Sequence, residues 1–283
     1  MLRVDLHLHS TASDGHFSPA ELVRKAANEG LAVIALTDHD TVDGIAAALE
    51  AARNFPGLRL IPGIEISTDI PEGEVHILGY FIDHTDGDLQ AALEKMRNSR
   101  WERARGMVAK LEKMGWPLDW ERVCEIAGDG TIGRPHIAQA MLERDHIRFF
   151  QEAFEKYIGR DGQAYVEREK VIPSEAVDLV VQAKGLPVLA HPLTIPEPEQ
   201  LAIKLKTVGL IGIEAYYASY ATEDVQRLVS IADRCNLIAT GGTDFHGIDT
   251  ETQMSIGGVE IPEESVECLL ALAQQPGLKF DGP

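Results

Sequence analysis

The sequence contains few cysteines and few basic residues, and each shortage excludes a class of protein. Its three cysteines, Cys124, Cys235 and Cys268, are odd in number and have no CxxC spacing. We therefore expect reduced thiols and no disulfide framework. Lysine and arginine number 26 against 45 aspartate and glutamate residues, so the net charge is 26 − 45 = −19. This balance argues against duplex DNA as a partner, because coating a duplex requires a basic stripe.

Long apolar runs are also missing. No stretch approaches the ~18 apolar residues that a membrane-spanning helix requires. No basic segment followed by an apolar run opens the chain, so no signal peptide is predicted. We expect a cytoplasmic protein without membrane association. The 283 residues and the 45% hydrophobic content fit one large α/β domain, with or without an insertion.

Strand and helix patterns alternate at the beginning of the chain. Ser18-Pro19-Ala20-Glu21 predicts a helix start, and Gly30 predicts its end. Residues 31–36 then form an unbroken apolar run, which is typical of a strand buried on both faces of a parallel sheet. The alternation resumes after about residue 174. The sequence therefore predicts an α/β fold with parallel strands.

The pattern changes in the middle of the chain. Residues 89–114 predict one long helix, and Gly115 and Pro117 predict its end. Only short helical patterns follow, up to about residue 157. We therefore predict α/β segments at residues 1–98 and 168–283, separated by a small helical insertion at residues 99–167.

Histidines and carboxylates gather where the predicted strands end. His7 and His9 are two residues apart on the first strand, so their imidazoles point to the same side. Six of the ten histidines belong to this set, in an arrangement that scattered surface histidines would not follow. The full set is His7, His9, Asp14, Asp38, His39, Asp40, Glu65, His76, His191, Asp244 and His246. Such imidazoles and carboxylates suit Mn²⁺, Zn²⁺ or Fe²⁺, and their number suffices for two or three ions.

Taken together, the motifs that hold these residues resemble those of the PHP (polymerase and histidinol phosphatase) family of metal-dependent phosphoesterases. The matching pieces, in chain order, are Asp5-Leu6-His7-Leu8-His9-Ser10, Thr37-Asp38-His39-Asp40, Gly63-Ile64-Glu65, His76, Ala190-His191-Pro192 and Thr243-Asp244-Phe245-His246. The resemblance implies a distorted (β/α)7 barrel that binds two or three divalent metal ions. It also implies a hydroxide shared by two metals as the nucleophile in phosphoester hydrolysis.

The resemblance further implies a division of the ligands among the ions. The first metal would be held by His7, His9, Glu65 and Asp244. Glu65 would bridge to a second metal held also by His76 and His191, and a third would be held by Asp14, His39 and His246. Manganese is the expected ion, with zinc or iron as alternatives. Glu65 and His246 are expected to take part in catalysis as well as in metal binding.

Asp38 and Asp40 are two further catalytic candidates. Each is placed to orient His39 or to transfer a proton. The alternative is that they cap the N-terminus of the following helix.

The insertion contains Gly133-Arg134-Pro135-His136 at a predicted helix start. A guanidinium and backbone donors at such a position can bind a phosphate, whereas the alternative is a surface arginine at a helix cap. The motif resembles that of a branch containing 3′,5′-nucleoside bisphosphate phosphatases and relatives that act on the 5′ ends of short RNA. Arg134 is the first candidate for holding a second phosphate, followed by His136, Arg160 and Lys170, although Arg160 also fits a solvated turn.

The leading hypothesis is a phosphatase that removes the 3′-phosphate from 3′,5′-nucleoside bisphosphates, such as adenosine 3′,5′-bisphosphate, and leaves the nucleoside 5′-monophosphate. The nearest alternative is a 5′→3′ exoribonuclease that acts on short RNA oligonucleotides. Histidinol phosphate phosphatase is a third hypothesis. A metal-free PHP module, of the kind attached to DNA polymerases, is the non-enzymatic one. The sequence indicates no oligomeric state.

Overall fold

The computed structural model describes residues 2–71, 73–128, 130–167, 171–247 and 254–274. These residues form one seven-stranded sheet in which the strands lie side by side in chain order. The strands are β1 (Val4–Leu8), β2 (Val33–Leu36), β3 (Arg59–Ile70), β4 (Gly73–Tyr80), β5 (Leu186–Leu189), β6 (Gly212–Tyr217) and β7 (Ile238–Gly242).

The sheet is mixed, which corrects the expectation of parallel strands. β1, β2 and β3 are parallel to one another, as are β5, β6 and β7. β4 runs antiparallel to both β3 and β5. The reason is the short connection from Ile70 to Gly73, since so few residues can join only antiparallel neighbours.

The two outer strands of the sheet approach each other at one end. Leu8 and Phe245 form a parallel bridge. The His9 N–H donates to the Phe245 carbonyl at 3.0 Å, and the Phe245 N–H donates to the His7 carbonyl at 3.3 Å. The sheet is therefore a nearly closed barrel, as expected for a distorted (β/α)7 fold, and the segment after β7 lies beside the end of β1.

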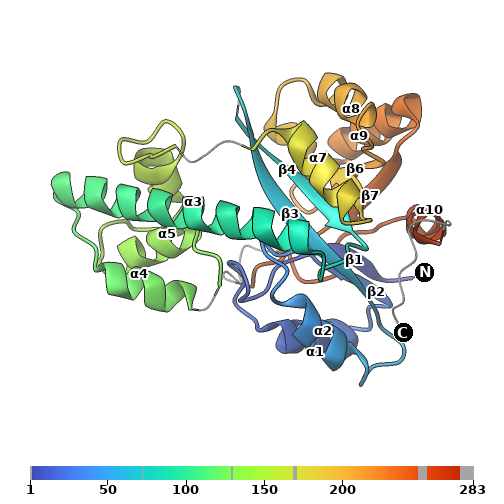
Figure 1. Ribbon diagram of the computed structural model, residues 1–283, viewed down its shortest axis with the longest axis horizontal. Helices are drawn as coiled ribbons and strands as arrows, with labels where there is room; N and C mark the ends of the chain where they lie inside the picture. Colours follow the sequence, from blue (N-terminus) through green and yellow to red (C-terminus); the bar gives the residue numbers. More distant parts are fainter. Residues whose placement is uncertain (1, 72, 129, 168–170, 248–253, 275–283) are drawn as a thin grey trace.

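Helices cover the outside of this barrel (Figure 1). They are α1 (Pro19–Asn28), α2 (Ile45–Ala52), α7 (Pro173–Gln182), α8 (Pro198–Lys206), α9 (Thr222–Cys235) and α10 (Glu263–Ala273). α1 begins at the predicted start with a capping box, in which the Ser18 hydroxyl accepts from the Glu21 N–H and the Glu21 carboxylate accepts from the Ser18 N–H. Among the described helices, none has the length and apolar character needed to cross a membrane.

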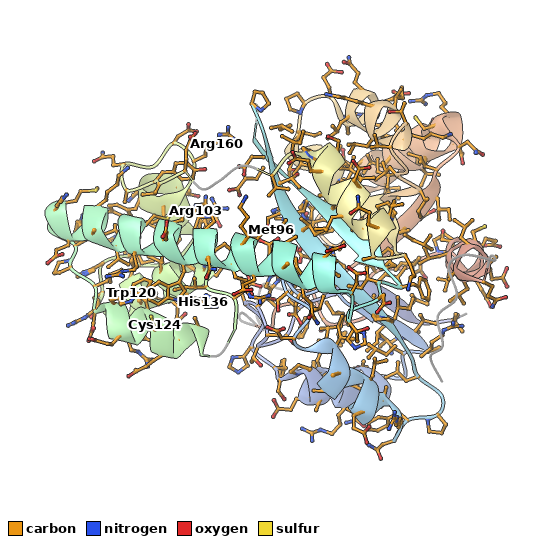
Figure 2. All side chains as sticks on the ribbon, in the orientation of Figure 1. Met96, Arg103, Trp120, Cys124, His136 and Arg160 are labelled. Atoms are coloured by element: carbon orange, nitrogen blue, oxygen red, sulfur yellow. The ribbon has the colours of Figure 1, made fainter. Side chains whose placement is uncertain are left out.

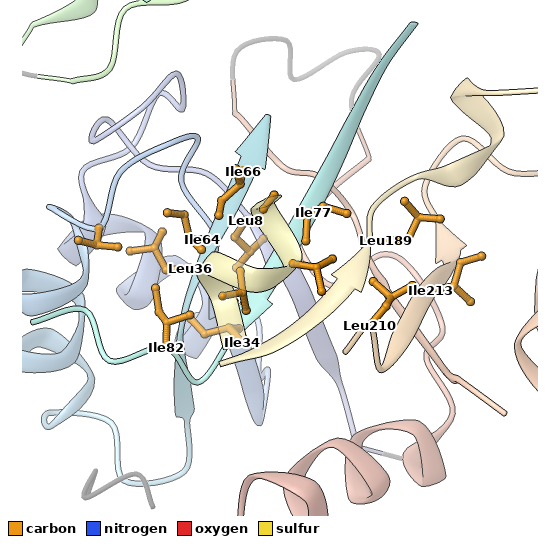
Figure 3. Close-up of a cluster of buried hydrophobic side chains, with 14 of the residues drawn as sticks. Leu8, Ile34, Leu36, Ile64, Ile66, Ile77, Ile82, Leu189, Leu210 and Ile213 are labelled. Carbon is orange, nitrogen blue, oxygen red and sulfur yellow. The ribbon is translucent and has the colours of Figure 1, made fainter. Parts of the chain in front are cut away.

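Alternating residues of the strands separate the core from the site. Ile64 and Ile66 of β3 belong to a buried apolar cluster with Ile34 and Leu36 of β2 (Figure 3). Because successive side chains on a strand point to opposite faces, Glu65 faces away from that cluster and into the barrel. The apolar packing on one face thus fixes the direction of the polar groups on the other.

The insertion packs around a core of its own. It contains the end of α3 (Gly87–Lys113), then α4 (Trp120–Ala127), α5 (Arg134–Glu143), α6 (Phe150–Ala153) and a π-helical turn (Phe154–Ile158). α3 crosses from the barrel to the insertion (Figure 1). Its Leu89 and Leu93 belong to the barrel core, whereas Met107 and Leu111 belong to the insertion core. The predicted boundary at residues 98 and 99 therefore falls within one continuous helix.

Candidate metal centre and substrate pocket

The candidate metal centre is built on the strands and on the segments that follow them, and Glu65 and His76 lie in the middle of β3 and β4 rather than at the predicted strand ends. His7 lies on β1, Glu65 on β3 and His76 on β4. A parallel bridge between His39 and Glu65 continues the pairing of β2 with β3 and places the two residues side by side. His9, His191, Asp244 and His246 follow the ends of β1, β5 and β7, and Asp14 lies in the loop after β1. The structure therefore brings together all nine residues that the sequence assigned to metal binding.

Glu65 lies at the centre of this group and is almost fully buried. One of its carboxylate oxygens, Oε2, lies 3.1 Å from His7 Nε2, 3.2 Å from His9 Nε2 and 3.1 Å from His39 Nδ1. The other, Oε1, lies 2.7 Å from His76 Nδ1 and 2.9 Å from His191 Nε2. One carboxylate thus contacts five imidazoles, three through one oxygen and two through the other.

Two aspartates complete the cluster. Asp244 Oδ1 lies 3.0 Å from His9 Nε2 and 3.4 Å from His7 Nε2. Asp14 Oδ1 lies 3.3 Å from His246 Nε2. The His246 Nδ1 contacts the Asp244 carbonyl at 2.8 Å. Because a carbonyl can only accept, Nδ1 carries a proton, and Nε2 is the nitrogen that faces the Asp14 carboxylate.

The donor atoms form three groups of the size that a cation requires. Within each group, the donor atoms lie within 4.8 Å of one another. The groups are His7, His9, Glu65 and Asp244; His9, Asp14, His39 and His246; and His39, Glu65 and His76. In addition, His9 Nδ1 and His191 Nδ1 are buried without a hydrogen-bond partner among the described residues. Imidazole and carboxylate donors of this kind fit Mn²⁺, Zn²⁺ and Fe²⁺.

The charges of the cluster depend on one another. Burial alone would raise the pKa of Glu65, but the neighbouring imidazoles, His39 and His7 first, hold that pKa well below its usual range. Burial would lower the pKa of His9, yet its contacts with Asp244 and Glu65 raise it to about 10. For His39 burial prevails and lowers the pKa to about 3. Protonated imidazoles therefore balance the negative charge of the carboxylates, a role that bound cations would otherwise fill.

A buried carboxylate that the sequence analysis missed orients two of these histidines. Glu214 lies on β6 and is fully buried. Its Oε1 lies 2.9 Å from His7 Nδ1, and its Oε2 accepts the His191 backbone N–H at 2.8 Å. Its only signal in the sequence is an acidic residue within the apolar run Gly212-Ile213-Glu214-Ala215.

The carboxylates of Asp38 and Asp40 bind the segments that surround the metal centre. The Asp38 carboxylate accepts from the hydroxyls of Ser10 and Ser13, both at 2.7 Å. The Asp40 carboxylate accepts from the Ser67 N–H at 2.9 Å and pairs with Arg100. The N-cap residue of α2 is Gly44, which supplies no side-chain cap. The catalytic role of Asp38 and Asp40 stays a prediction.

A cavity of about 100 Å³ joins the metal centre to the insertion. Asp14, His39 and His76 line it on the barrel side. Arg100 and Arg103 from α3 and Arg134 from α5 line it on the insertion side. The sequence analysis singled out Arg134 but missed the other two arginines, whose spacing of three residues places them on one face of α3.

The other predicted substrate-binding residues lie elsewhere. His136 is buried, and its Nδ1 accepts the Gly133 N–H at 2.9 Å, so it caps the start of its own helix. Arg160 donates to the carbonyls of Ile70 and Pro71 at the β3–β4 hairpin. Figure 2 shows Arg103 on α3, with Arg160 and His136 on opposite sides of it. Lys170 lies outside the described residues.

This barrel with its cluster of histidines and carboxylates defines a metal-dependent phosphoesterase of the PHP type. The PHP domain family matches residues 5–157, more than half of the chain, and the chain belongs to that family.

The curated relatives are named enzymes. The chain is 35% identical to a 5′-3′ exoribonuclease of Haemophilus influenzae, over 86% of this chain and 90% of the relative. It is also 35% identical to a 3′,5′-nucleoside bisphosphate phosphatase of Chromobacterium violaceum, over 87% of this chain and 88% of the relative. A solved structure from Bifidobacterium adolescentis, described as a metal-dependent phosphoesterase, is 30% identical and superposes with a TM-score of 0.86, with 95% of each chain covered.

Proposed function

We propose that this protein is a metal-dependent phosphatase that hydrolyses the 3′-phosphate of 3′,5′-nucleoside bisphosphates, such as adenosine 3′,5′-bisphosphate, to give nucleoside 5′-monophosphates. One observation carries the proposal. A single cavity is lined both by Asp14, His39 and His76 of the imidazole and carboxylate cluster and by Arg100, Arg103 and Arg134. Such a cavity is suited to a small molecule with an anionic group at each end.

We assign the metal ligands as the resemblance to the PHP family implies. His7, His9, Glu65 and Asp244 would hold one ion, and Glu65 would share a second with His76 and His191. Asp14, His39 and His246 would hold a third, and manganese is the proposed ion. When bound, these ions would lower the pKa of a water molecule and offset the negative charge of a phosphoryl group.

The chain's own residues position the substrate and its protons. The guanidiniums of Arg103 and Arg134 would bind the phosphate that is not cleaved, because charge-assisted hydrogen bonds from arginine suit phosphate oxygens. His246, with its proton fixed on Nδ1 by the Asp244 carbonyl, keeps Nε2 available at the cluster. Glu65 holds the imidazoles around one point. Asp38 and Asp40 support the neighbouring loops.

The insertion would act as the part that selects the substrate. We propose that residues 99–167 form a cap over a barrel made of residues 1–98 and 168–283. Its separate apolar core and its contribution of Arg103 and Arg134 to the cavity support this division. We also propose a cytoplasmic location, in keeping with the free state of Cys124, Cys235 and Cys268.

A second candidate is hydrolysis of short RNA from its 5′ end. It is favoured by the 35% identity to the Haemophilus influenzae 5′-3′ exoribonuclease. The two activities need the same metals, and they differ in whether the bond cleaved is a monoester or a diester.

Phosphate release from adenosine 3′,5′-bisphosphate with added Mn²⁺, measured beside 3′-AMP, 5′-AMP and a short 5′-phosphorylated RNA, tests the proposal. We expect turnover of the bisphosphate to exceed that of both monophosphates, and Asp244→Ala to abolish it in a folded protein. Equal turnover of bisphosphate and monophosphates would remove the proposed substrate. Preferential release of mononucleotides from the RNA would favour the second candidate.

A further inference from the structure

The carboxylate of Glu74 lies between two of the cavity's arginines. Glu74 is the second residue of β4, whereas Arg103 and Arg134 come from α3 and α5 of the insertion. Glu74 Oε1 accepts from Arg103 at 3.1 Å, and Glu74 Oε2 pairs with Arg134. A barrel strand thus supplies the counter-charge for two guanidiniums of the insertion.

These guanidiniums are largely withdrawn from water. The Arg103 side chain is 7% exposed, and its Nε donates to the Val166 carbonyl at 3.0 Å. The Arg134 guanidinium lies 5.8 Å from the centre of the Phe154 ring. Burial, followed by the charge of Arg134, lowers the pKa of Arg103. Two cations are therefore held close together in a poorly solvated place, and Glu74 offsets their repulsion.

The strand also sets the place of Glu74 relative to the metal centre. Glu74 and His76 are two residues apart on β4, so their side chains point to the same side at a spacing of about 7 Å along the strand. Both residues line the cavity. The Glu74 carboxylate therefore occupies N–H donors of Arg103 and Arg134. A second anionic group of the substrate would need the same donors.

We propose that Glu74 is a specificity-determining residue. Its carboxylate occupies the guanidiniums of Arg103 and Arg134, here called the arginine site, in place of the substrate's second phosphate. This inference rests on the proposed function and deepens it. A phosphate that enters must displace the Glu74 carboxylate or share the two guanidiniums with it. Glu74 therefore lowers the affinity of the arginine pair for anions. A substrate without a second phosphate gains nothing at this site and leaves the ion pairs intact.

Glu74→Gln tests the proposal because the amide keeps the size of the side chain and removes its charge. We expect the KM for adenosine 3′,5′-bisphosphate to fall about fivefold, with the change in KM and not in kcat. The preference for the bisphosphate over 3′-AMP should rise by the same factor. A merely structural role would instead alter both substrates alike, or would lower kcat. Either of those results would overturn the proposal.

Binding to the metal-free protein separates this inference from the proposed function. Calorimetric titration with 5′-AMP should show tighter binding to Glu74→Gln than to the wild-type protein. If this gain appears but the bisphosphate is not hydrolysed, the anion site stands and the proposed substrate fails. If the bisphosphate is hydrolysed but Glu74→Gln changes neither binding nor KM, the proposed function stands and the role of Glu74 fails.

Two further variants control the interpretation. Glu143→Gln makes the same chemical change at an insertion glutamate that pairs with Arg122 outside the cavity, and it should leave KM unchanged. In an Arg134→Gln background, Glu74→Gln should lose most of its benefit, because the two residues then no longer share an ion pair. Additive effects in the double variant would show that Glu74 does not act through Arg134 and would overturn the proposal that it competes for the pair of arginines.

Discussion

Replacing Glu214 with glutamine should weaken metal binding about 10- to 100-fold while leaving the protein folded. Glu214 is fully buried on β6, and its two oxygens contact two separate groups. Oε1 lies 2.9 Å from His7 Nδ1, and Oε2 accepts the His191 N–H at 2.8 Å. Glutamine has nearly the same volume but only one acceptor oxygen. Its amide nitrogen must therefore face one of the two groups.

Both orientations of the glutamine impair the metal centre. If the amide nitrogen faces His191, two N–H groups oppose each other, and an unpaired buried donor costs about 1–3 kcal/mol. If it faces His7, the imidazole proton must move to Nε2, the nitrogen that lies 3.1 Å from Glu65. A protonated nitrogen cannot bind a cation. A tenfold loss of affinity corresponds to about 1.4 kcal/mol, so the expected range agrees with the cost of one lost hydrogen bond.

Calorimetric titration of Mn²⁺ into metal-stripped protein measures this effect directly. Glu199→Gln is the matched control, because Glu199 is an exposed glutamate that pairs with Arg234 at the surface. Activity of Glu214→Gln should recover toward the wild-type value as Mn²⁺ is raised to saturation. Unchanged Mn²⁺ affinity in a folded Glu214→Gln protein would refute the reasoning.

Three further results are expected. Arg134→Gln should raise the KM for adenosine 3′,5′-bisphosphate about tenfold or more with little change for 3′-AMP, because a charged hydrogen bond to one phosphate is lost; steady-state kinetics showing equal effects on both substrates would contradict this. Mn²⁺ affinity should rise between pH 6.5 and 8, because the pKa of His9 is raised to about 10 and its proton must leave before a cation binds; calorimetry in buffers of different ionisation enthalpy should detect the released protons, and a pH-independent affinity would refute the assignment. Leu111→Ala, at a fully buried position of the insertion core, should lower the free energy of unfolding by about 2–5 kcal/mol. Hydrogen exchange should then accelerate in the insertion and not in the barrel strands. Uniform acceleration would show that the two parts unfold together.

The metal centre was predictable because its residues obey a local rule. The carboxyl ends of neighbouring strands in an α/β barrel meet at one edge, so polar residues that follow apolar runs are brought together. His7 and Asp244 lie far apart in the sequence, yet His7 is next to the end of β1 and Asp244 follows the end of β7. The strand pattern therefore places these two together, whereas Glu65 lies in the middle of β3 and was found through its motif. The direction of β4 depended instead on the tight turn after Ile70, which the alternation of strands and helices did not reveal.

The arginine site was predictable only in part because it depends on how the insertion packs. Arg134 stands out at a helix start, but Arg100 and Arg103 belong to a long helix whose charged residues resemble an ordinary solvated face. Their role follows from the passage of α3 along the barrel, where Arg100 meets Asp40 in the segment after β2 and Arg103 meets Glu74 on β4. These pairs join residues 60 and 29 positions apart in the chain, and no local pattern specifies them.

The distribution of charge connects the two ends of the cavity with the choice of substrate. A chain with a net charge of −19 should repel a polyanionic nucleotide. That repulsion is offset where cations gather, and in the cavity these places are the proposed metal ions and the guanidiniums of Arg103 and Arg134. A nucleotide with one phosphate can use only one of these places, whereas a bisphosphate can use both. Selectivity for two phosphates is therefore the expected result of placing two cationic sites in an otherwise acidic protein.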